Sequence, residues 1–206
     1  MNNAQLILKM QERYDSRTRQ EILTNLNIAI AQGKTKGLEL DRYRSLPKIT
    51  NRSKHTVMSW FNRPKKIPLI DLCTIASYLH YNIFAFFIIN DNRETAVQDF
   101  LIANDYYNEH YPVDSADIYI RAYNMQINTD KNIVVDKLEK YFGTTKEVLK
   151  NRYKRQYRIM EICNCTESVY HAWFNRGRAN VRIPLLSLCK LAIAANTDIF
   201  DFMMEE

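Results

Sequence analysis

One long phrase occurs twice in this chain, and it restricts the fold more than any other feature. SWFNRPKKIPLIDLCTIA begins at Ser59, and AWFNRGRANVRIPLLSLCKLA begins at Ala172. Both read Trp-Phe-Asn-Arg, a basic stretch, Ile-Pro-Leu and Leu-Cys, and both continue to Ile-Phe-x-Phe. A period of this length is typical of a duplicated domain and not of a solenoid of short repeats.

The two occurrences align with a single insertion. They are offset by 113 residues up to the basic loop and by 116 residues after it, so the second loop is three residues longer. We use "first copy" and "second copy" for the residues matched in this register. Matched pairs include Ile49 with Ile162, Asn51 with Asn164, Ser53 with Thr166, and Trp60 with Trp173.

Composition favours an all-α protein. The chain has 206 residues, of which 46% are hydrophobic and 25% charged, as in ordinary globular domains. Only 4 Gly and 5 Pro occur and alternating apolar runs are few, which favours helices over sheets. The longest apolar runs, such as IFAFFII at 83–89, are too short to span a bilayer, and no signal peptide opens the chain, so we expect a cytoplasmic protein.

The first copy predicts a particular order of short helices. Asn51 is expected at a turn, because asparagine tolerates the left-handed conformation. Ser53 is expected to cap the helix after it, and Pro68 to open another. The helices predicted around that turn span 38–44, 46–50 and 54–63.

The second copy repeats this order. Thr144 or Thr145 is expected to cap a helix that contains 146–157, and a short helix over 158–162 follows it. Asn164 is the predicted turn, and Thr166 is the predicted N-cap of a helix that ends near residue 175.

An acidic, tyrosine-rich segment lies between the copies. We predict a helical bridge at 91–128, with helices over 92–108 and 114–127. It is too apolar for a flexible linker. Its tyrosines are expected to pack between domains or subunits, because the acidic surroundings would repel a nucleic acid.

The four cysteines are interpreted as core residues. Cys73 and Cys189 occupy matched places on apolar helix faces, where cysteine behaves as a small hydrophobic residue. Cys163, Cys165 and His171 are close in sequence, but a zinc site needs about four ligands. We therefore predict no metal and no cofactor, and a reducing compartment.

Basic charge follows the repeat. The chain carries a net charge of +6, yet residues 34–66 carry +8, residues 144–182 carry +6, and the rest carries −8. Two basic stretches on an otherwise acidic protein predict a polyanionic partner such as nucleic acid. The alternative is a pair of solvated helix surfaces.

The predicted unit resembles a known family. A short helix, a turn residue, an N-capped helix that ends in an aromatic residue, a polar loop, a proline and then Leu-x-x-Leu-x-x-Ile-Ala are similar to the helix-turn-helix of Cro and lambda repressor, the xenobiotic-response-element family. The likeness covers roughly half of the chain. Departures are Asn51 and Asn164 where the family usually has Gly, and Arg63 and Arg176 where it often has Gly.

The resemblance implies three segments and an interface. The segments are a first helix-turn-helix domain with N-terminal helices at 1–90, the bridge at 91–128, and a second helix-turn-helix domain at 129–206. In that family the second motif helix enters the major groove, and its N-terminal residues contact base edges. The implied DNA-binding residues are Arg52, Ser53, Lys54, His55, Ser59, Arg63, Lys65 and Lys66 in the first copy, and Thr166, Glu167, Ser168, Arg176, Arg178 and Arg182 in the second.

The two helices are not expected to read the same bases. Lys54 and His55 can donate to guanine, whereas Glu167 can accept from cytosine but repels phosphate. The second copy is therefore expected either to read another sequence or to depend on its loop arginines. Matched apolar residues such as Trp60 and Trp173 are interpreted as core packing.

These observations predict a sequence-specific, double-stranded DNA-binding transcriptional regulator, with repression as the expected mode. Two units in one chain can act as a built-in dimer, with half-sites about one DNA turn apart, roughly 34 Å. The alternative is a phage- or plasmid-type inhibitor that binds a protein, through the second domain or the bridge, on a helix-turn-helix scaffold. Whether two chains form a homodimer is left open by the sequence. An enzyme is not expected, since no phosphate-binding glycine loop, HExxH or nucleophile with a base partner occurs.

Overall fold

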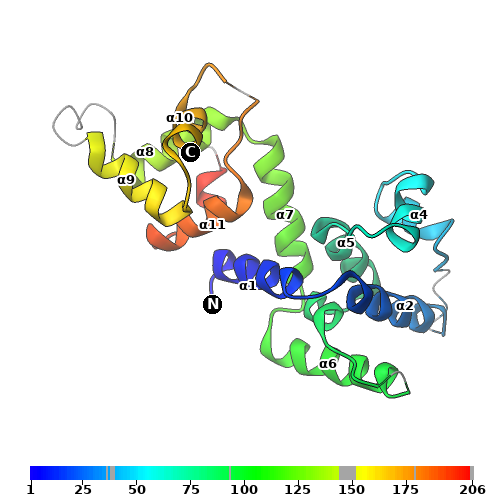
Figure 1. The fold of residues 1–206 in the computed structure, drawn as a ribbon. Coiled ribbons are helices and arrows are strands. Elements are labelled where there is room, and N and C mark those ends of the chain that lie inside the picture. Colours follow the sequence, from blue (N-terminus) through cyan, green and yellow to red (C-terminus); the bar gives the residue numbers. More distant parts are fainter. Residues whose placement is uncertain (36, 38–39, 93, 144–151, 179, 205–206) are drawn as a thin grey trace. The chain divides into compact units, whose positions relative to one another are not determined.

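The computed structural model is all helical, as predicted (Figure 1). Its described residues form eleven α-helices and two 3-10 helices and contain no strand. None of the helices in these residues has the length and apolar character needed to cross a bilayer. The described residues are 1–35, 37, 40–92, 94–143, 152–178 and 180–204.

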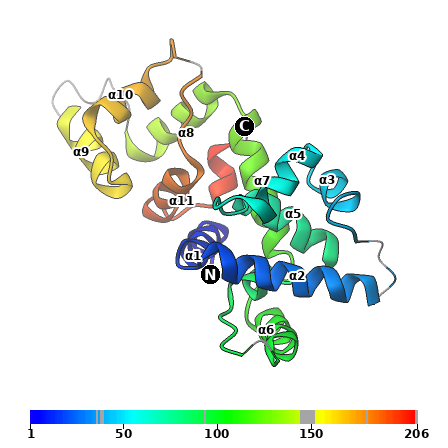
Figure 2. The same cartoon turned by 45° about the vertical axis from the view of Figure 1, so that its right-hand side comes forward.

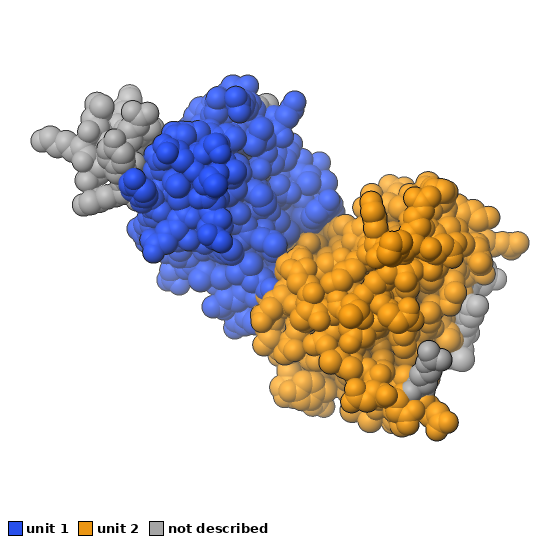
Figure 3. Space-filling model, viewed as in Figure 1, with its two compact units in different colours: residues 1–8, 121–206 blue, residues 9–120 orange. Residues whose placement is uncertain are grey.

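The contacts between residues divide the chain into two compact units (Figure 3). One unit comprises residues 9–120, and the other comprises residues 121–206 together with residues 1–8. The division falls inside two helices, α1 (Asn3–Asp15) and α7 (Ser115–Asn128). The domain boundaries expected from the sequence, near residues 90 and 128, stay predictions.

The unit of residues 9–120 contains the first copy. Helix α3 packs against both α4 and α5 (Figure 2). The 3-10 helix η1 packs against α2, α5 and α6. Its core is aromatic: Phe84, Phe86 and Phe100 are fully buried, and the rings of Phe86 and Phe100 meet edge to face at 5.8 Å. Its complete helices are α2 (Arg19–Thr35), α3 (Ser45–Ile49), α4 (Lys54–Asn62), α5 (Leu69–Leu79), η1 (Ile83–Phe87) and α6 (Ala96–His110).

Helix α6, the first helix of the predicted bridge, packs onto the first copy. The Asn104 side chain accepts a hydrogen bond from the backbone N–H of Asn82 at 2.8 Å. The ring of Tyr111 stacks on Phe84 at 4.4 Å, and Tyr107 lies 5.7 Å from the same ring. These two bridge tyrosines therefore pack, and they do so within this unit.

The unit of residues 121–206 contains the second copy and repeats the same neighbours. Helix α9 packs against α10 and α11, and η2 packs against α8 and α11. Leu138, Ile159 and Phe202 are fully buried in its core. Its complete helices are α8 (Lys131–Phe142), α9 (Arg152–Cys163), α10 (Glu167–Phe174), α11 (Leu185–Ala194) and η2 (Ile199–Phe202).

Two of the predicted helices were wrong. Helix α9 is continuous, where a break near residue 158 was expected, because its sequence RYKRQYRIMEIC contains no Gly or Pro to interrupt it. The predicted helix over 38–44 is a turn in its described part, residues 40–44. There the Asp41 carboxylate accepts hydrogen bonds from the backbone N–H groups of Tyr43 and Arg44, which favours the turn. The predicted caps Thr144 and Thr145 lie outside the described residues.

Candidate nucleic-acid interface

The turn between two helices has the same conformation in both copies. Asn51 lies between α3 and α4 with φ of 52°, and Asn164 lies between α9 and α10 with φ of 51°. Both are in the left-handed region, which asparagine enters more readily than other residues with a side chain. The predicted turns at these two positions are confirmed.

The helices that follow these turns begin differently. Ser53 has extended backbone angles, and its side chain accepts a hydrogen bond from the N–H of Thr56 at 3.1 Å, so the predicted N-cap of α4 is confirmed. Thr166 also has extended angles but makes no side-chain cap. Its hydroxyl lies 3.0 Å from that of Ser168 instead. The sequence therefore identified the N-cap position of α10, but not the missing hydrogen bond.

The C-terminal end of each of these helices is held by a basic side chain that begins an earlier helix. Arg19, the first residue of α2, donates from Nη2 to the carbonyl oxygens of Trp60 and Phe61 at 2.8 and 2.7 Å. Lys131, the first residue of α8, is buried, and burial lowers its pKa. Its Nζ donates at 2.8, 3.0 and 3.0 Å to the carbonyl oxygens of Ala172, Asn175 and Arg178.

An arginine covers the aromatic residue after the repeated tryptophan in both copies. The guanidinium of Arg42 lies 4.8 Å from the Phe61 ring, and that of Arg155 lies 5.1 Å from the Phe174 ring. Each arginine also bonds the helix at the start of its copy. Arg42 donates to Asn27 at 2.6 Å, and Arg155 to Glu139 at 3.4 Å. Helices α2 and α8 therefore match with an offset of 112 residues.

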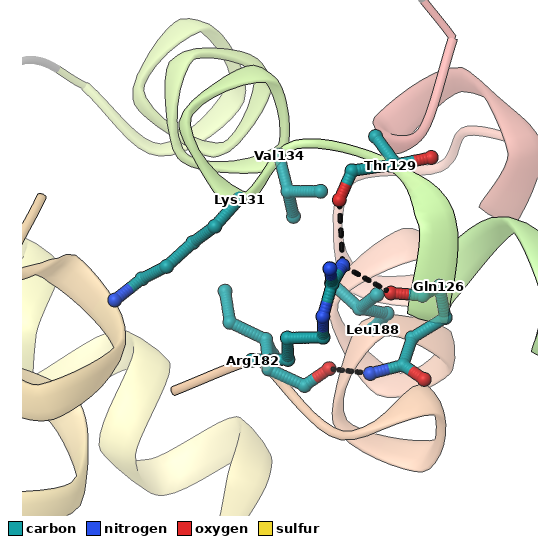
Figure 4. Close-up of a pocket in the computed structure, with 7 residues that line it drawn as sticks. Gln126, Thr129, Lys131, Val134, Arg182 and Leu188 are labelled. Carbon is teal, nitrogen blue, oxygen red and sulfur yellow. Dashed lines mark hydrogen bonds between the residues drawn. The ribbon is translucent and has the colours of Figure 1, made fainter. Parts of the chain in front are cut away.

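The loop cations Lys66 and Arg182 are matched and have the same role. Lys66 Nζ donates to the carbonyl oxygens of Tyr14 and Asp15, at the end of α1, at 3.2 and 3.1 Å. Arg182 Nη1 donates to those of Gln126 and Thr129, at the end of α7, at 3.1 and 2.6 Å (Figure 4). These two predicted DNA contacts are therefore engaged with backbone of their own units.

Side chains of α1 and α7 in turn donate hydrogen bonds to the loops that contain Lys66 and Arg182. The Tyr14 hydroxyl donates to the carbonyl oxygen of Ile67 at 2.9 Å, and Gln126 Nε2 donates to that of Ile183 at 3.0 Å. The duplication therefore includes α1 and α7. The repeated phrase did not reveal this, because tyrosine in one copy and glutamine in the other make the same bond.

The cavity beside Arg182 is too small for a ligand. Its volume is about 10 Å³, which leaves room for about one water molecule. Figure 4 shows Arg182, which lines the cavity, hydrogen-bonded to Gln126 and Thr129. It is lined by Gln126, Thr129, Lys131, Val134, Arg182, Ile183 and Leu188.

Two further predicted arginines form ion pairs. Arg52 Nε lies 2.9 Å from Asp71 Oδ1. Burial raises the pKa of Asp71, and the bond to Arg52 offsets part of that effect. Arg176 Nη2 lies 2.6 Å from Asp136 Oδ1 and 3.3 Å from Glu139 Oε2.

The remaining predicted residues of the first copy are exposed, with one exception. Lys54 and His55 lie on the first turn of α4, and Arg63 and Lys65 follow its end; all four are exposed. The described part of the chain shows no ion pair for Arg63 or Lys65. Ser59 is half-buried, and its hydroxyl donates at 2.6 Å to a carbonyl oxygen of its own helix.

The corresponding surface of the second copy begins with a carboxylate. Glu167 and Ser168 are exposed on the first turn of α10, and Arg178 is exposed in the loop. Glu167 Oε1 lies 3.2 Å from His171 Nε2, and hydrogen bonds from Gln156 and His171 lower the pKa of Glu167. The first turn of α10 therefore carries a negative charge at neutral pH.

A basic hollow near α4 was not among the predicted site residues. It lies between α3 and α5, and its volume is about 790 Å³. Arg44 and Lys48 supply its positive charge, and both belong to the stretch of net charge +8. The net charge of this stretch indicates a basic surface but not its place in the fold, and the family resemblance implies contacts from α4 and not from this hollow. The lining residues are Arg44, Ser45, Lys48, Ile49, Thr74, Ser77 and Tyr78.

The matched cysteines are core residues. Cys73 and Cys189 are buried, as predicted, and burial raises the pKa of Cys73 far above its usual value and that of Cys189 to about 12. Cys163 is also buried, with a pKa raised to about 11. No group of three or more His, Cys, Asp or Glu side chains suited to a metal ion occurs among the described residues.

Comparison with known proteins gave no relative. No family model matches the chain, and neither a curated protein nor a solved structure matches it significantly.

Proposed function

We propose that this chain is a duplex-DNA-binding transcriptional regulator of the helix-turn-helix kind, and that α4 is the helix that enters the major groove. One observation carries the proposal. Helix α4 follows the left-handed Asn51, is capped by Ser53, and leaves Lys54 and His55 exposed on its first turn. A major groove admits an α-helix, and cationic or ring N–H donors can reach the acceptor atoms of guanine.

Cations on both sides of α4 support the same proposal. Arg63 and Lys65 are exposed beyond its C-terminal end, Lys48 is exposed on α3, and Arg44 is exposed just before α3. Phosphate contacts from such side chains provide most of the affinity for duplex DNA and fix the register of the protein on it.

A protein-binding role is the second candidate, and it is favoured by one difference between the copies. At the positions of Lys54 and Thr56, the second copy exposes Glu167 and Val169, and the latter is 37% exposed. A carboxylate beside an apolar side chain suits a protein partner better than a phosphate backbone.

Binding to random-sequence duplex DNA across a salt series tests the first proposal. The logarithm of the affinity is expected to fall steeply with the logarithm of the salt concentration, and the Arg63→Ala/Lys65→Ala variant to flatten the slope by about two. Arg13→Ala, an exposed arginine on α1, serves as the control and should leave the slope unchanged. Absence of salt-dependent binding by the wild type would show the DNA proposal to be wrong.

A further inference from the structure

Matched arginines at the end of the two helices have different surroundings. Arg176 is held between Asp136 and Glu139 of α8, at 2.6 and 3.3 Å. Arg63, its counterpart in the first copy, is exposed and has no ion pair within the described residues. The two carboxylates beside Arg176 offset its charge, so a phosphate is attracted less strongly to Arg176 than to Arg63.

The different surroundings of Arg63 and Arg176 result from residues on α2 in the first copy and α8 in the second. Since α2 and α8 match with an offset of 112 residues, the counterparts of Asp136 and Glu139 are Thr24 and Asn27, which carry no charge. The carboxylates that neutralise Arg176 are therefore particular to the second copy.

The charge on the first turn of the helix after the asparagine turn also differs in sign between the copies. Lys54 in the first copy corresponds to Glu167 in the second, and His55 corresponds to Ser168. A carboxylate on the first turn of a helix is stabilised by the helix dipole, and Glu167 is further bonded by His171. It therefore occupies the region where a phosphate would otherwise be attracted.

Two cations in the described part of the second copy are engaged within their own unit, whereas Arg158 on α9 is exposed. Arg182 bonds the end of α7, and Arg155 is buried under Phe174. Arg178 is exposed, but its loop lies beside the ion pair of Arg176 with the two carboxylates.

We infer that carboxylates of the second copy close its α10 surface to DNA, and that a single chain reads one half-site, through α4. This inference rests on the proposed function and replaces the expectation of two half-sites per chain. An operator with two half-sites about one turn apart then needs a second chain.

Exchange of the matched residues tests the inference in both directions. One variant gives the second copy the residues of the first: Asp136→Thr/Glu139→Asn/Glu167→Lys/Ser168→His. Its control, Asp105→Lys/Glu109→Lys, makes the same change in net charge on exposed positions of α6. The reverse variant is Thr24→Asp/Asn27→Glu, with Gln98→Glu/Ile102→Glu on α6 as its control.

The readouts are the salt slope on random duplex DNA and the length of the hydroxyl-radical footprint on a selected site. The first variant is expected to steepen the slope by about two and to add a second protected region. The reverse variant is expected to flatten it by about one, because Arg63 becomes paired as Arg176 is. Both controls should leave the footprint unchanged, and urea unfolding verifies that every variant folds.

Two outcomes separate this inference from the proposed function. If Arg176→Ala/Arg178→Ala flattens the wild-type slope as much as Arg63→Ala/Lys65→Ala does, the second copy binds DNA and the inference is overturned while the function stands. A wild-type footprint of two regions one turn apart, from one chain per duplex, would have the same meaning. If the wild type shows no salt-dependent binding, the proposed function itself fails.

Discussion

Arg19 and Lys131 are structural equivalents: each begins a helix, and each donates hydrogen bonds to carbonyl oxygens at the C-terminal end of the helix that follows a left-handed asparagine. The two residues lie outside the repeated phrase. Because these carbonyl oxygens have no partner within their own helix, a positive side chain both satisfies them and suits the negative end of the helix dipole.

Replacement of Lys131 should destabilise the second copy strongly. Lys131→Met keeps most of the apolar stem but leaves three carbonyl oxygens without their donor, and we expect the free energy of unfolding to fall by about 2–3 kcal/mol. Lys131→Arg should recover much of this loss, because Arg19 fills the same place in the first copy. Urea denaturation measures both, with Arg178→Ala as an exposed control that keeps its backbone carbonyl. Equal stability of Lys131→Met and the control would contradict the assignment.

The two N-cap positions should respond differently to alanine. Ser53→Ala removes a hydrogen bond to the N–H of Thr56, so a loss of about 1 kcal/mol is expected. Thr166→Ala removes no side-chain cap and should cost clearly less. Denaturation curves of the two variants in the same buffer give the comparison, and a larger loss for Thr166→Ala would show that its hydroxyl does cap α10.

Asp71 should make stability depend on pH in a particular direction. Burial raises its pKa in the folded state above the ordinary value, so the folded protein holds this proton to a higher pH than the unfolded chain does. The stability linked to that proton is present at low pH and is lost as pH rises through the folded pKa. Relative to wild type, Asp71→Asn should therefore gain stability between pH 4 and pH 7.

Denaturation midpoints of wild type and Asp71→Asn across that range measure the effect. Arg52 provides an internal comparison, since Arg52→Ala removes the ion pair that lowers the pKa of Asp71 and should steepen the pH dependence. A wild-type protein that gains stability relative to Asp71→Asn with rising pH would show that the ion pair outweighs burial.

The four thiols should differ in reactivity. Cys73, Cys163 and Cys189 are buried, and burial raises their pKa values, to about 11 for Cys163 and about 12 for Cys189. Cys165 is only half-buried. At pH 8 we expect one thiol to react with Ellman's reagent in the folded protein and all four in denaturant, because only an accessible thiolate reacts. Peptide mass mapping identifies the site. Rapid modification of Cys163 in the folded protein would contradict the burial described above.

Sequence patterns predicted those parts of the fold that depend on local chemistry. The turns at Asn51 and Asn164 and the cap at Ser53 follow from preferences of single residues, and they were predicted correctly. The continuous helix α9 was missed because the order of short helices predicted for the first copy was also expected in the second. The first copy has Pro47 where the second has Met160, and Met160 does not interrupt a helix. The composition also predicted the all-α class.

The candidate site was harder to predict because charge counts ignore pairing. A net charge of +6 around the second copy suggested a surface for DNA, yet Arg176 and Arg182 are bound to groups of their own unit. Their partners lie 37 to 56 residues away in the sequence, at Asp136, Glu139, Gln126 and Thr129. Only the folded chain brings such groups together, so a sum over a window of sequence counted cations that the fold had already neutralised.

The bond between Gln126 and the carbonyl oxygen of Ile183 has a practical consequence for dissecting the molecule. A fragment that begins at residue 129 would lose α7 and both bonds between Gln126 and the loop before α11, and only the bond from Arg182 to Thr129 would remain. Stability or binding measured on such a fragment would therefore not represent the second copy in the full chain. A fragment of the second copy therefore has to include residues 121–128 to keep the bonds made by Gln126.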